Sequence, residues 1–194
     1  MRLMIDLDGV IFDFVHGFSS LAVALGVHDT IMYGQDQLEW HFPFQTKEVW
    51  SYIKRTDNWW LGLQPLVSPA EIEMINELVT GDDHIVYFIT SRPDTAGTTN
   101  GGVDEAKYQA YESLRNLGIQ VTPHEIYAID GKSKGELCET LGVTVALDDN
   151  IRQLEDLKRW GITAVARTWP YNSEWDGERV DSVERFIREY VDGR

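Results

Sequence analysis

Short apolar runs alternate with longer amphipathic segments over the second half of the sequence, and this alternation constrains the fold more than any other feature. The apolar runs have the length of β-strands, and several amphipathic segments end at a glycine that would stop a helix. The predicted strands cover residues 84–89, 125–129, 143–147 and 162–166, and the predicted helices cover residues 104–117, 133–141, 151–160 and 181–191. Strands that alternate with helices form a parallel sheet with helices on both faces. We therefore predict an α/β fold with a Rossmann-like sheet.

A further apolar run, residues 3–7, predicts a buried strand close to the N-terminus. Three of the predicted strands end in polar side chains with chemical uses: Asp6 and Asp8, Thr90 and Ser91, and Asp148 and Asp149. In an open parallel sheet, ligands lie beyond the carboxyl ends of the strands. We therefore expect these three pairs to lie at one edge of the sheet and to form a site.

Between the first and second predicted strands the pattern is helical. Helical spacing extends over residues 13–25 and 46–55, and Ser68 is the expected N-cap of a helix that ends near residue 79. Pro69, at the first position of that helix, favours the same start.

We predict that the chain has two parts. Residues 1–14 and 81–194 form the α/β core, and residues 15–80 form a small helical cap that is inserted after the first strand and returns to the core through a helix.

The predicted cap is rich in aromatic side chains. A small cap needs a core of its own, and aromatic rings can provide it. We expect that role for most members of one group: Trp40, Phe42, Phe44, Trp50 and Tyr52. Trp59 and Trp60 are candidates for the wall of a substrate pocket, with a core role as the alternative.

The acidic balance of the chain limits its partners. The formal net charge is -15, and such a surface repels nucleic acid and anionic membranes. We expect no long nucleic acid and no membrane as partner, although a local positive site can still hold a small anion. No apolar run approaches the ~20 residues of a membrane helix, and two aspartates in the N-terminal stretch argue against a signal peptide, so we expect a cytoplasmic protein. The single cysteine, Cys138, excludes an internal disulfide and is expected to be a buried thiol.

Asp6 and Asp8 leave the first predicted strand on the same side, because residues two apart on a strand share a face. One carboxylate can attack phosphorus and form an aspartyl-phosphate. The other can protonate the leaving oxygen and then deprotonate water. Gly9 would let the backbone turn sharply beside them. The alternative is a strand end with two solvated aspartates.

Asp148 and Asp149 suggest a metal site. Carboxylate oxygens suit a hard cation such as Mg²⁺, which takes one or two protein carboxylates together with waters and substrate phosphate. We therefore predict magnesium as the cofactor. The alternative is an N-cap for the helix that begins near residue 151.

Two further segments supply candidate phosphate ligands. The hydroxyl and amide groups of Thr90 and Ser91 suit a phosphate oxygen, with an ordinary turn as the alternative. Arg92 is either an anion ligand that could bind substrate or a surface residue. A lysine near the start of the helix at 133–141 can neutralise the nucleophile and the transferring phosphate, or it can be a solvated surface lysine. We prefer Lys134, which lies nearer the helix body, and keep Lys132 as the reserve.

These segments, in this order, resemble the four motifs of the haloacid dehalogenase superfamily, and the match spans the whole chain. The matching segments are Asp6-Leu7-Asp8-Gly9-Val10, Thr90, Lys134 and Asp148-Asp149. The resemblance implies that Asp6 is the nucleophile and Asp8 the general acid/base. Members without the second aspartate are dehalogenases or ATPases, so Asp8 implies a phosphatase or a phosphotransferase.

The same resemblance implies the remaining roles. A threonine or serine at Thr90 orients the phosphoryl group and Lys134 neutralises its charge. Asp6, the backbone carbonyl of Asp8 and Asp149 bind magnesium. Asp148 acts through a water or a hydrogen bond.

A narrower resemblance is to the 5′(3′)-deoxyribonucleotidases. It rests on Asp6-Leu7-Asp8-Gly9-Val10-Ile11-Phe12-Asp13-Phe14 and on Asn58-Trp59-Trp60-Leu61-Gly62-Leu63-Gln64-Pro65-Leu66. That family has a small helical cap at this place in the chain and uses aromatic side chains around the nucleobase. Ser91-Arg92-Pro93 and the small-residue loop at 96–102 depart from the usual continuation of the family.

The leading hypothesis is a magnesium-dependent phosphomonoesterase, a 5′-nucleotidase for (deoxy)ribonucleoside monophosphates. The expected partner is a small phosphorylated metabolite. One alternative keeps the chemistry and changes the substrate to a sugar phosphate, an amino-acid phosphate or a 3′-phosphate at a nucleic-acid end, the last disfavoured by the negative charge. Another alternative is a non-catalytic binding module on the same fold. The intact set of candidate site residues argues against it.

Overall fold

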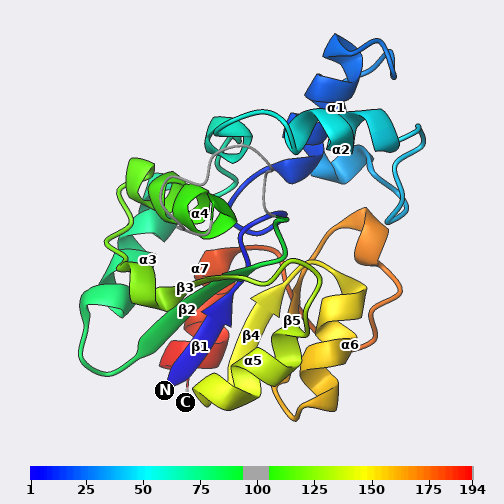
Figure 1. Cartoon of the computed structure of the whole chain (residues 1–194). Helices are drawn as coiled ribbons and strands as arrows, with labels where there is room; N and C mark the ends of the chain where they lie inside the picture. The colour runs from blue at the N-terminus through cyan, green and yellow to red at the C-terminus, as the bar shows by residue number, and fades with distance from the viewer. Residues whose placement is uncertain (94–104, 194) are drawn as a thin grey trace.

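A computed structural model describes residues 1–93 and 105–193 of the protein, and within them six strands form one parallel sheet (Figure 1). The strands are β1 (Arg2–Ile5), β2 (Ile85–Thr90), β3 (Ile126–Ala128), β4 (Val145–Asp148), β5 (Thr163–Arg167) and β6 (Glu178–Val180). Their order is β3-β2-β1-β4-β5-β6, so β1 and β4, which lead into the acidic pairs, are central neighbours. The predicted α/β fold with a parallel sheet is confirmed. The predicted loop at 96–102 lies outside the described residues.

Helices connect these strands, as the sequence pattern predicts. They are α1 (Phe14–Ala24), α2 (Lys47–Ile53), α3 (Pro69–Thr80), α4 (Glu105–Asn116), α5 (Lys134–Leu141), α6 (Ile151–Arg159) and α7 (Val183–Phe186). Short 3₁₀ turns occur at Gly34–Asp36, Trp59–Gly62, Pro123–Glu125 and Pro170–Asn172. The helix predicted at 181–191 starts later, as α7, and continues as a π-helix at Ile187–Asp192. Across the two described stretches, every helix is too short or too polar to cross a bilayer.

Each face of the sheet carries its own apolar layer, because successive side chains on a strand point to opposite faces. On β1, Leu3 and Ile5 belong to one buried cluster and Met4 to the other. Side chains of α3, α4 and α7 complete the first cluster, and side chains of α5 and α6 complete the second. Cys138 of α5 is fully buried, as expected, and burial raises the pKa of its thiol to about 12.

The edge strand β6 is absent from the sequence-based prediction. Its three residues, Glu-Arg-Val, show no apolar run long enough to indicate a strand. It forms by pairing with the exposed edge of β5, with Arg167 opposite Val180. The indole nitrogen of Trp175 also donates to the carbonyl of Glu178, at 3.1 Å. Tertiary pairing, and not local pattern, therefore determines this strand.

Helices α1 and α2 lie beyond the carboxyl ends of the central strands (Figure 1). Phe14, at the start of α1, stacks on Trp50 of α2, with ring centroids 5.8 Å apart, and on Trp60, at 6.0 Å. These aromatic contacts join the segments that we predict to form the cap, and the division of the chain into core and cap stays a prediction.

The aromatic residues expected to form the core of the cap fall into two groups. Phe42, Phe44 and Trp50 pack against the large buried cluster, as expected. Trp40 and Tyr52 are exceptions, with 39% and 41% of their surfaces exposed. Trp40 instead borders the cavity described below.

Candidate active site

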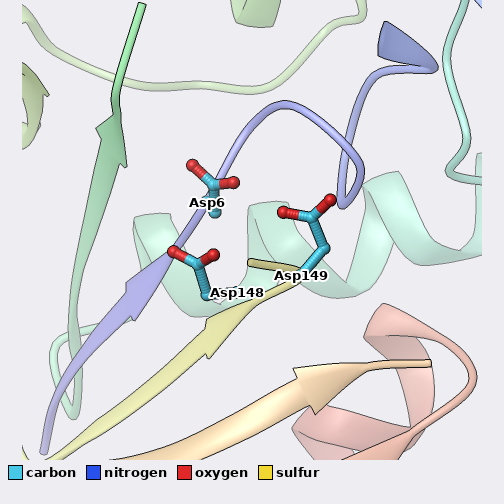
Figure 2. Close-up of side chains that lie close together, drawn as sticks. All are labelled: Asp6, Asp148 and Asp149. Atoms are coloured by element: carbon cyan, nitrogen blue, oxygen red, sulfur yellow. The ribbon is translucent and has the colours of Figure 1, made fainter. Parts of the chain in front are cut away.

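Three buried carboxylates meet where β1 and β4 end side by side. Asp6 directly follows β1, Asp148 is the last residue of β4, and Asp149 comes next (Figure 2). The pairing of the two strands aligns these ends, and the backbone N–H of Asp6 donates to the carbonyl of Leu147 at 2.9 Å. One oxygen from each carboxylate lies within 4.8 Å of the others. The two acidic strand ends therefore converge, as the sequence predicts.

Lys134, the first residue of α5, places its ammonium among these carboxylates. Its Nζ lies 2.7 Å from Asp6 Oδ1 and 2.6 Å from Asp148 Oδ2, and the residue is 1% exposed. The side chain of Ser133 caps α5 and so fixes its first turn beside the site. Lys132 is exposed. Of the two candidate lysines, Lys134 is the one that contacts Asp6.

Asp8 is held by two residues from the end of β2. Thr90 Oγ1 donates to Asp8 Oδ2 at 3.1 Å. The guanidinium of Arg92 spans both carboxylate oxygens, with Nε 2.9 Å from Oδ2 and Nη2 2.8 Å from Oδ1. Arg92 is 1% exposed, and its Cζ lies 4.8 Å from the centroid of the Trp60 ring. Arg92 is therefore part of the site and not a surface residue.

A segment that sequence analysis did not single out holds Asp149. Tyr171 Oη donates to Asp149 Oδ2 at 2.6 Å, and Asn172 Nδ2 donates to the Asp149 carbonyl at 2.8 Å. The indole nitrogen of Trp169 donates to the carbonyl of Gly9 at 2.7 Å. The available signal was position, because this segment follows β5 at the same edge of the sheet as the other site residues.

The turn after β1 needs glycine at position 9. Gly9 has a φ of +80°, a conformation that side-chain-bearing residues rarely adopt. A Cβ at this position would lie 2.0 Å from Asp149 Oδ2. The predicted role of Gly9 as a sharp turn is confirmed, and close approach to Asp149 is a second requirement.

Burial dominates the electrostatics of the carboxylates. It raises the pKa of Asp6 well above its usual value, Lys134 opposes the rise, and Asp148 adds to it. Burial also raises the pKa of Asp149 to about 7, again with a contribution from Asp148. For Lys134, burial acts to lower the pKa, but the two paired carboxylates outweigh it and hold the pKa above its usual range. Three buried carboxylates share one ammonium, and the raised pKa values mean that their negative charge is disfavoured unless a proton or a cation is bound.

The donor set fits magnesium, which prefers oxygen ligands. Both oxygens of Asp148 already accept hydrogen bonds, Oδ2 from Lys134 and Oδ1 from the backbone N–H of Asn150 at 2.9 Å. Among the described residues, no hydrogen bond is made to Asp6 Oδ2 or to Asp149 Oδ1. The free oxygens therefore suit direct ligation by Asp6 and Asp149, with Asp148 in a supporting position.

A cavity of about 230 Å³ opens above the carboxylates. Its aromatic walls are Phe14, Trp40, Trp50 and Trp60. Of the two tryptophans predicted as candidate wall residues, Trp60 lines this cavity, whereas Trp59 borders a separate hollow beside Gly17. Ser91 also lines the cavity, and its hydroxyl accepts a hydrogen bond from Gln153 Nε2 at 3.2 Å. The site thus combines an anionic floor with flat apolar walls.

No protein-family model matches the sequence, and no curated protein matches it significantly. Solved structures with a similar fold do exist. A haloacid dehalogenase-like family hydrolase from Streptococcus pneumoniae is 17% identical, with a TM-score of 0.59 over 97% of each chain. The D,D-heptose 1,7-bisphosphate phosphatase from B. bronchiseptica, complexed with magnesium and phosphate, is 13% identical, with a TM-score of 0.54 over 100% of each chain.

A third similar structure is a HAD family hydrolase from Deinococcus radiodurans with bound phosphate and sodium. It is 14% identical, with a TM-score of 0.58 over 99% of this chain and 96% of that one. The narrower resemblance to deoxyribonucleotidases stays a prediction. At these identities the likeness concerns the fold, and the protein therefore has the haloacid dehalogenase-like α/β fold.

Proposed function

We propose that the protein is a magnesium-dependent phosphomonoesterase that acts through an aspartyl-phosphate on Asp6, with (deoxy)ribonucleoside monophosphates as substrates. One observation carries the proposal. The Lys134 ammonium lies within 2.7 Å of Asp6 in a buried carboxylate cluster, with Asp8 bordering the same cavity. The proposed nucleophile, a charge-neutralising cation and a second carboxylate thus line one cavity.

The reaction has two steps. In the first, a carboxylate oxygen of Asp6 attacks phosphorus, the bond from phosphorus to the leaving oxygen breaks, and Asp8 donates a proton to that oxygen. In the second, Asp8 takes a proton from water, the water oxygen attacks phosphorus, and the bond from phosphorus to Asp6 breaks. Inorganic phosphate leaves and the Asp6 carboxylate is restored.

The surrounding residues stabilise the transferring group. In the proposed reaction, Lys134 and the hydroxyl of Thr90 would contact phosphoryl oxygens; their contacts with Asp6 and Asp8 support this role. A magnesium ion held by Asp6 and Asp149 would offset the negative charge of those oxygens. Ser91 supplies a further hydroxyl at the cavity wall.

The cavity walls support a nucleotide as the substrate. Stacking of a base on an aromatic side chain is worth ~1–3 kcal/mol, and Trp40, Trp50 and Trp60 offer such surfaces. The narrower sequence resemblance to deoxyribonucleotidases agrees with this assignment.

A sugar phosphate is the second candidate. The observation that favours it is the fold likeness to a heptose bisphosphate phosphatase, whose name gives a phosphorylated sugar as its substrate. Aromatic walls also pack against the apolar faces of sugars. The buried contact between Lys134 and Asp6 argues against a non-catalytic role.

Phosphate release from a panel of substrates tests the proposal. The purified protein is incubated with nucleoside monophosphates and sugar phosphates, with magnesium chloride or with EDTA. We expect magnesium-dependent release with the highest kcat/KM for a nucleoside monophosphate. Release that is unaffected by EDTA would contradict the metal requirement. If the protein prefers a sugar phosphate over every nucleotide, the nucleotide assignment is wrong and the sugar-phosphate assignment takes its place.

A further inference from the structure

A second cavity, of about 180 Å³, adjoins the one above the carboxylates. Phe14, Trp40 and Trp50 line both cavities. Asp8, the proposed general acid, lines the first cavity and not the second. The leaving oxygen of a substrate must therefore lie in the first cavity. The rest of the leaving group would extend past the shared aromatic side chains toward the second cavity.

Gln37 lines the second cavity and carries a polar atom without a partner. The residue is 3% exposed. Its Nε2 donates to the backbone carbonyl of Trp40 at 3.0 Å, and this bond fixes which end of the amide is the oxygen. Among the described residues, no donor reaches Gln37 Oε1. Folded proteins satisfy nearly all buried acceptors with protein, water or ligand groups, so the unpaired oxygen of a residue that lines a cavity points to a partner supplied from that cavity.

We propose that the second cavity is a specificity subsite in which Gln37 Oε1 accepts a hydrogen bond from an N–H group on a planar ring of the leaving group. The proposal deepens the proposed function and rests on it. It makes Gln37 the residue that distinguishes nucleobases by the donors on their edges.

The composition of the cavity favours a flat ring over a hydroxylated chain. Phe42 and Trp50 contribute aromatic surface to it, and Trp40 meets Tyr171 edge-on, with ring centroids 5.7 Å apart. Aromatic faces pack well against planar rings. A ring without an N–H group could still enter, but it would leave the Gln37 oxygen unpaired and would therefore bind less tightly.

The test compares two variants on matched substrates. Gln37→Met removes the acceptor and keeps the length of the side chain. Gln35→Met makes the same change at an exposed position two residues away, in the 3₁₀ turn that Gln37 follows. The substrates are thymidine 5′-monophosphate and its N3-methyl derivative, deoxycytidine 5′-monophosphate and its N4,N4-dimethyl derivative, and ribose 5-phosphate, which lacks a base. kcat and KM are measured with magnesium chloride present.

The wild type should prefer the N–H-bearing member of at least one pair by about tenfold in kcat/KM, mainly through KM; tenfold corresponds to about 1.4 kcal/mol. The preference should disappear in Gln37→Met and persist in Gln35→Met, and ribose 5-phosphate should be turned over equally by all three proteins. This comparison separates the hydrogen bond from the bulk of the methyl groups, because a steric penalty would remain in Gln37→Met.

Two results would overturn the inference and leave the proposed function intact. The first is a preference for the N–H-bearing substrate that survives in Gln37→Met. The second is a loss of kcat/KM in Gln37→Met that is as large for ribose 5-phosphate as for the nucleotides. If the wild type releases no phosphate from any nucleotide, the proposed function is wrong, and the inference that rests on it is overturned as well. If Gln37→Met does not fold by circular dichroism, Gln37→Ala takes its place and must likewise lose the preference for the N–H ring; a preference that survives in it would overturn the inference.

Discussion

Two buried cations, Lys134 and Arg92, form ion pairs with different carboxylates of the site. Lys134 joins Asp6 to Asp148, whereas Arg92 spans both oxygens of Asp8. Thr90 also donates to Asp8, so both oxygens of that carboxylate are engaged. We therefore expect a leaving oxygen that approaches Asp8 to compete with Arg92 and Thr90 for these carboxylate oxygens.

Asp6 and Asp8, the two aspartates with proposed catalytic roles, should respond differently to substitution. Asp6→Asn should abolish turnover and any covalent phosphate, because the amide is a poor nucleophile. Asp8→Asn should slow hydrolysis of natural esters by roughly 100- to 10,000-fold. The loss should be smaller for p-nitrophenyl phosphate, whose leaving group needs little protonation. Steady-state kinetics on both ester types measures the difference, and equal losses would contradict the role of Asp8.

The lack of space for a side chain at Gly9 leads to a second prediction. Gly9→Ala should raise the magnesium concentration needed for half-maximal activity, because the new Cβ would displace the carboxylate of Asp149. The control is Gly26→Ala. Gly26 also has a positive φ, of +68°, but an alanine methyl group there would meet no atom of the described residues within 4 Å beyond its chain neighbours. Backbone strain should cost each variant about 1–2 kcal/mol of stability, and the clash with Asp149 should add to the cost in Gly9→Ala.

Magnesium titration of activity, together with thermal melting, distinguishes strain from displacement. A shift in magnesium requirement that is the same for both variants would show that backbone strain alone is responsible.

At the scale of whole elements, one carboxylate joins two helices. Glu71 Oε2 accepts from the backbone N–H of Ser68, completing the capping box of α3. Its Oε1 accepts from the backbone N–H groups of Val183 and Glu184 at the start of α7, at 2.9 and 3.2 Å. The predicted cap of α3 is therefore correct, and the same side chain also holds the C-terminal helix against the core.

This double cap should make part of the stability dependent on pH. Burial acts to raise the pKa of Glu71, but hydrogen bonds from Ser68 and Glu184 outweigh it and lower the pKa below its usual value of 4.5. A lowered folded-state pKa contributes stability that is present above the unfolded pKa and is lost as pH falls through the folded pKa. Glu71→Gln should therefore cost ~1 kcal/mol at neutral pH, and the difference from wild type should shrink below pH 4.5.

Urea unfolding of Glu71→Gln and wild type at neutral and acid pH measures this effect. Glu73→Gln, at an exposed position two residues away on α3, is the matched control and should change stability little at either pH. A cost for Glu71→Gln that does not vary with pH would assign the effect to hydrogen-bond geometry and not to charge.

At the scale of the whole molecule, the site exists because distant segments of the chain share one edge of the sheet. The first cavity takes its lining from residues as far apart as Asp6 and Gln153. The buried carboxylates follow the strands, whereas the aromatic walls come from the segment between β1 and β2. If the proposed function is correct, chemistry and specificity depend on different parts of the chain and should be separable by mutation.

Trp40 offers a direct test of that separation. Trp40→Ala should lower kcat/KM for nucleoside monophosphates about tenfold, because stacking is worth ~1–3 kcal/mol, and should change turnover of ribose 5-phosphate little. Tyr52→Ala is the control, since Tyr52 is similarly exposed but lines neither cavity. Kinetics on both substrates measures the effect, and equal losses of Trp40→Ala on both would exclude stacking as its role.

The sequence by itself determined the parallel sheet and the convergence of the site. Apolar runs that are buried on both faces favour central strands, and carboxyl ends of parallel strands share one edge, so the sequence predicts Asp6 and Asp148 at the same edge, where the pairing of β1 with β4 brings them together. Helix signals at Ser68 and Gly142 act over a few residues, and local sequence therefore predicts them well.

Only the tertiary structure decided which side chains fill the space above that edge. Trp59 and Trp60 are neighbours in sequence, yet only Trp60 lines the cavity above the carboxylates. Tyr171 reaches Asp149, and Arg92 reaches Asp8, across many residues of chain. β6 depends on a partner strand and has no local signal. These contacts depend on how separate elements pack together, and no periodicity along the chain encodes that packing.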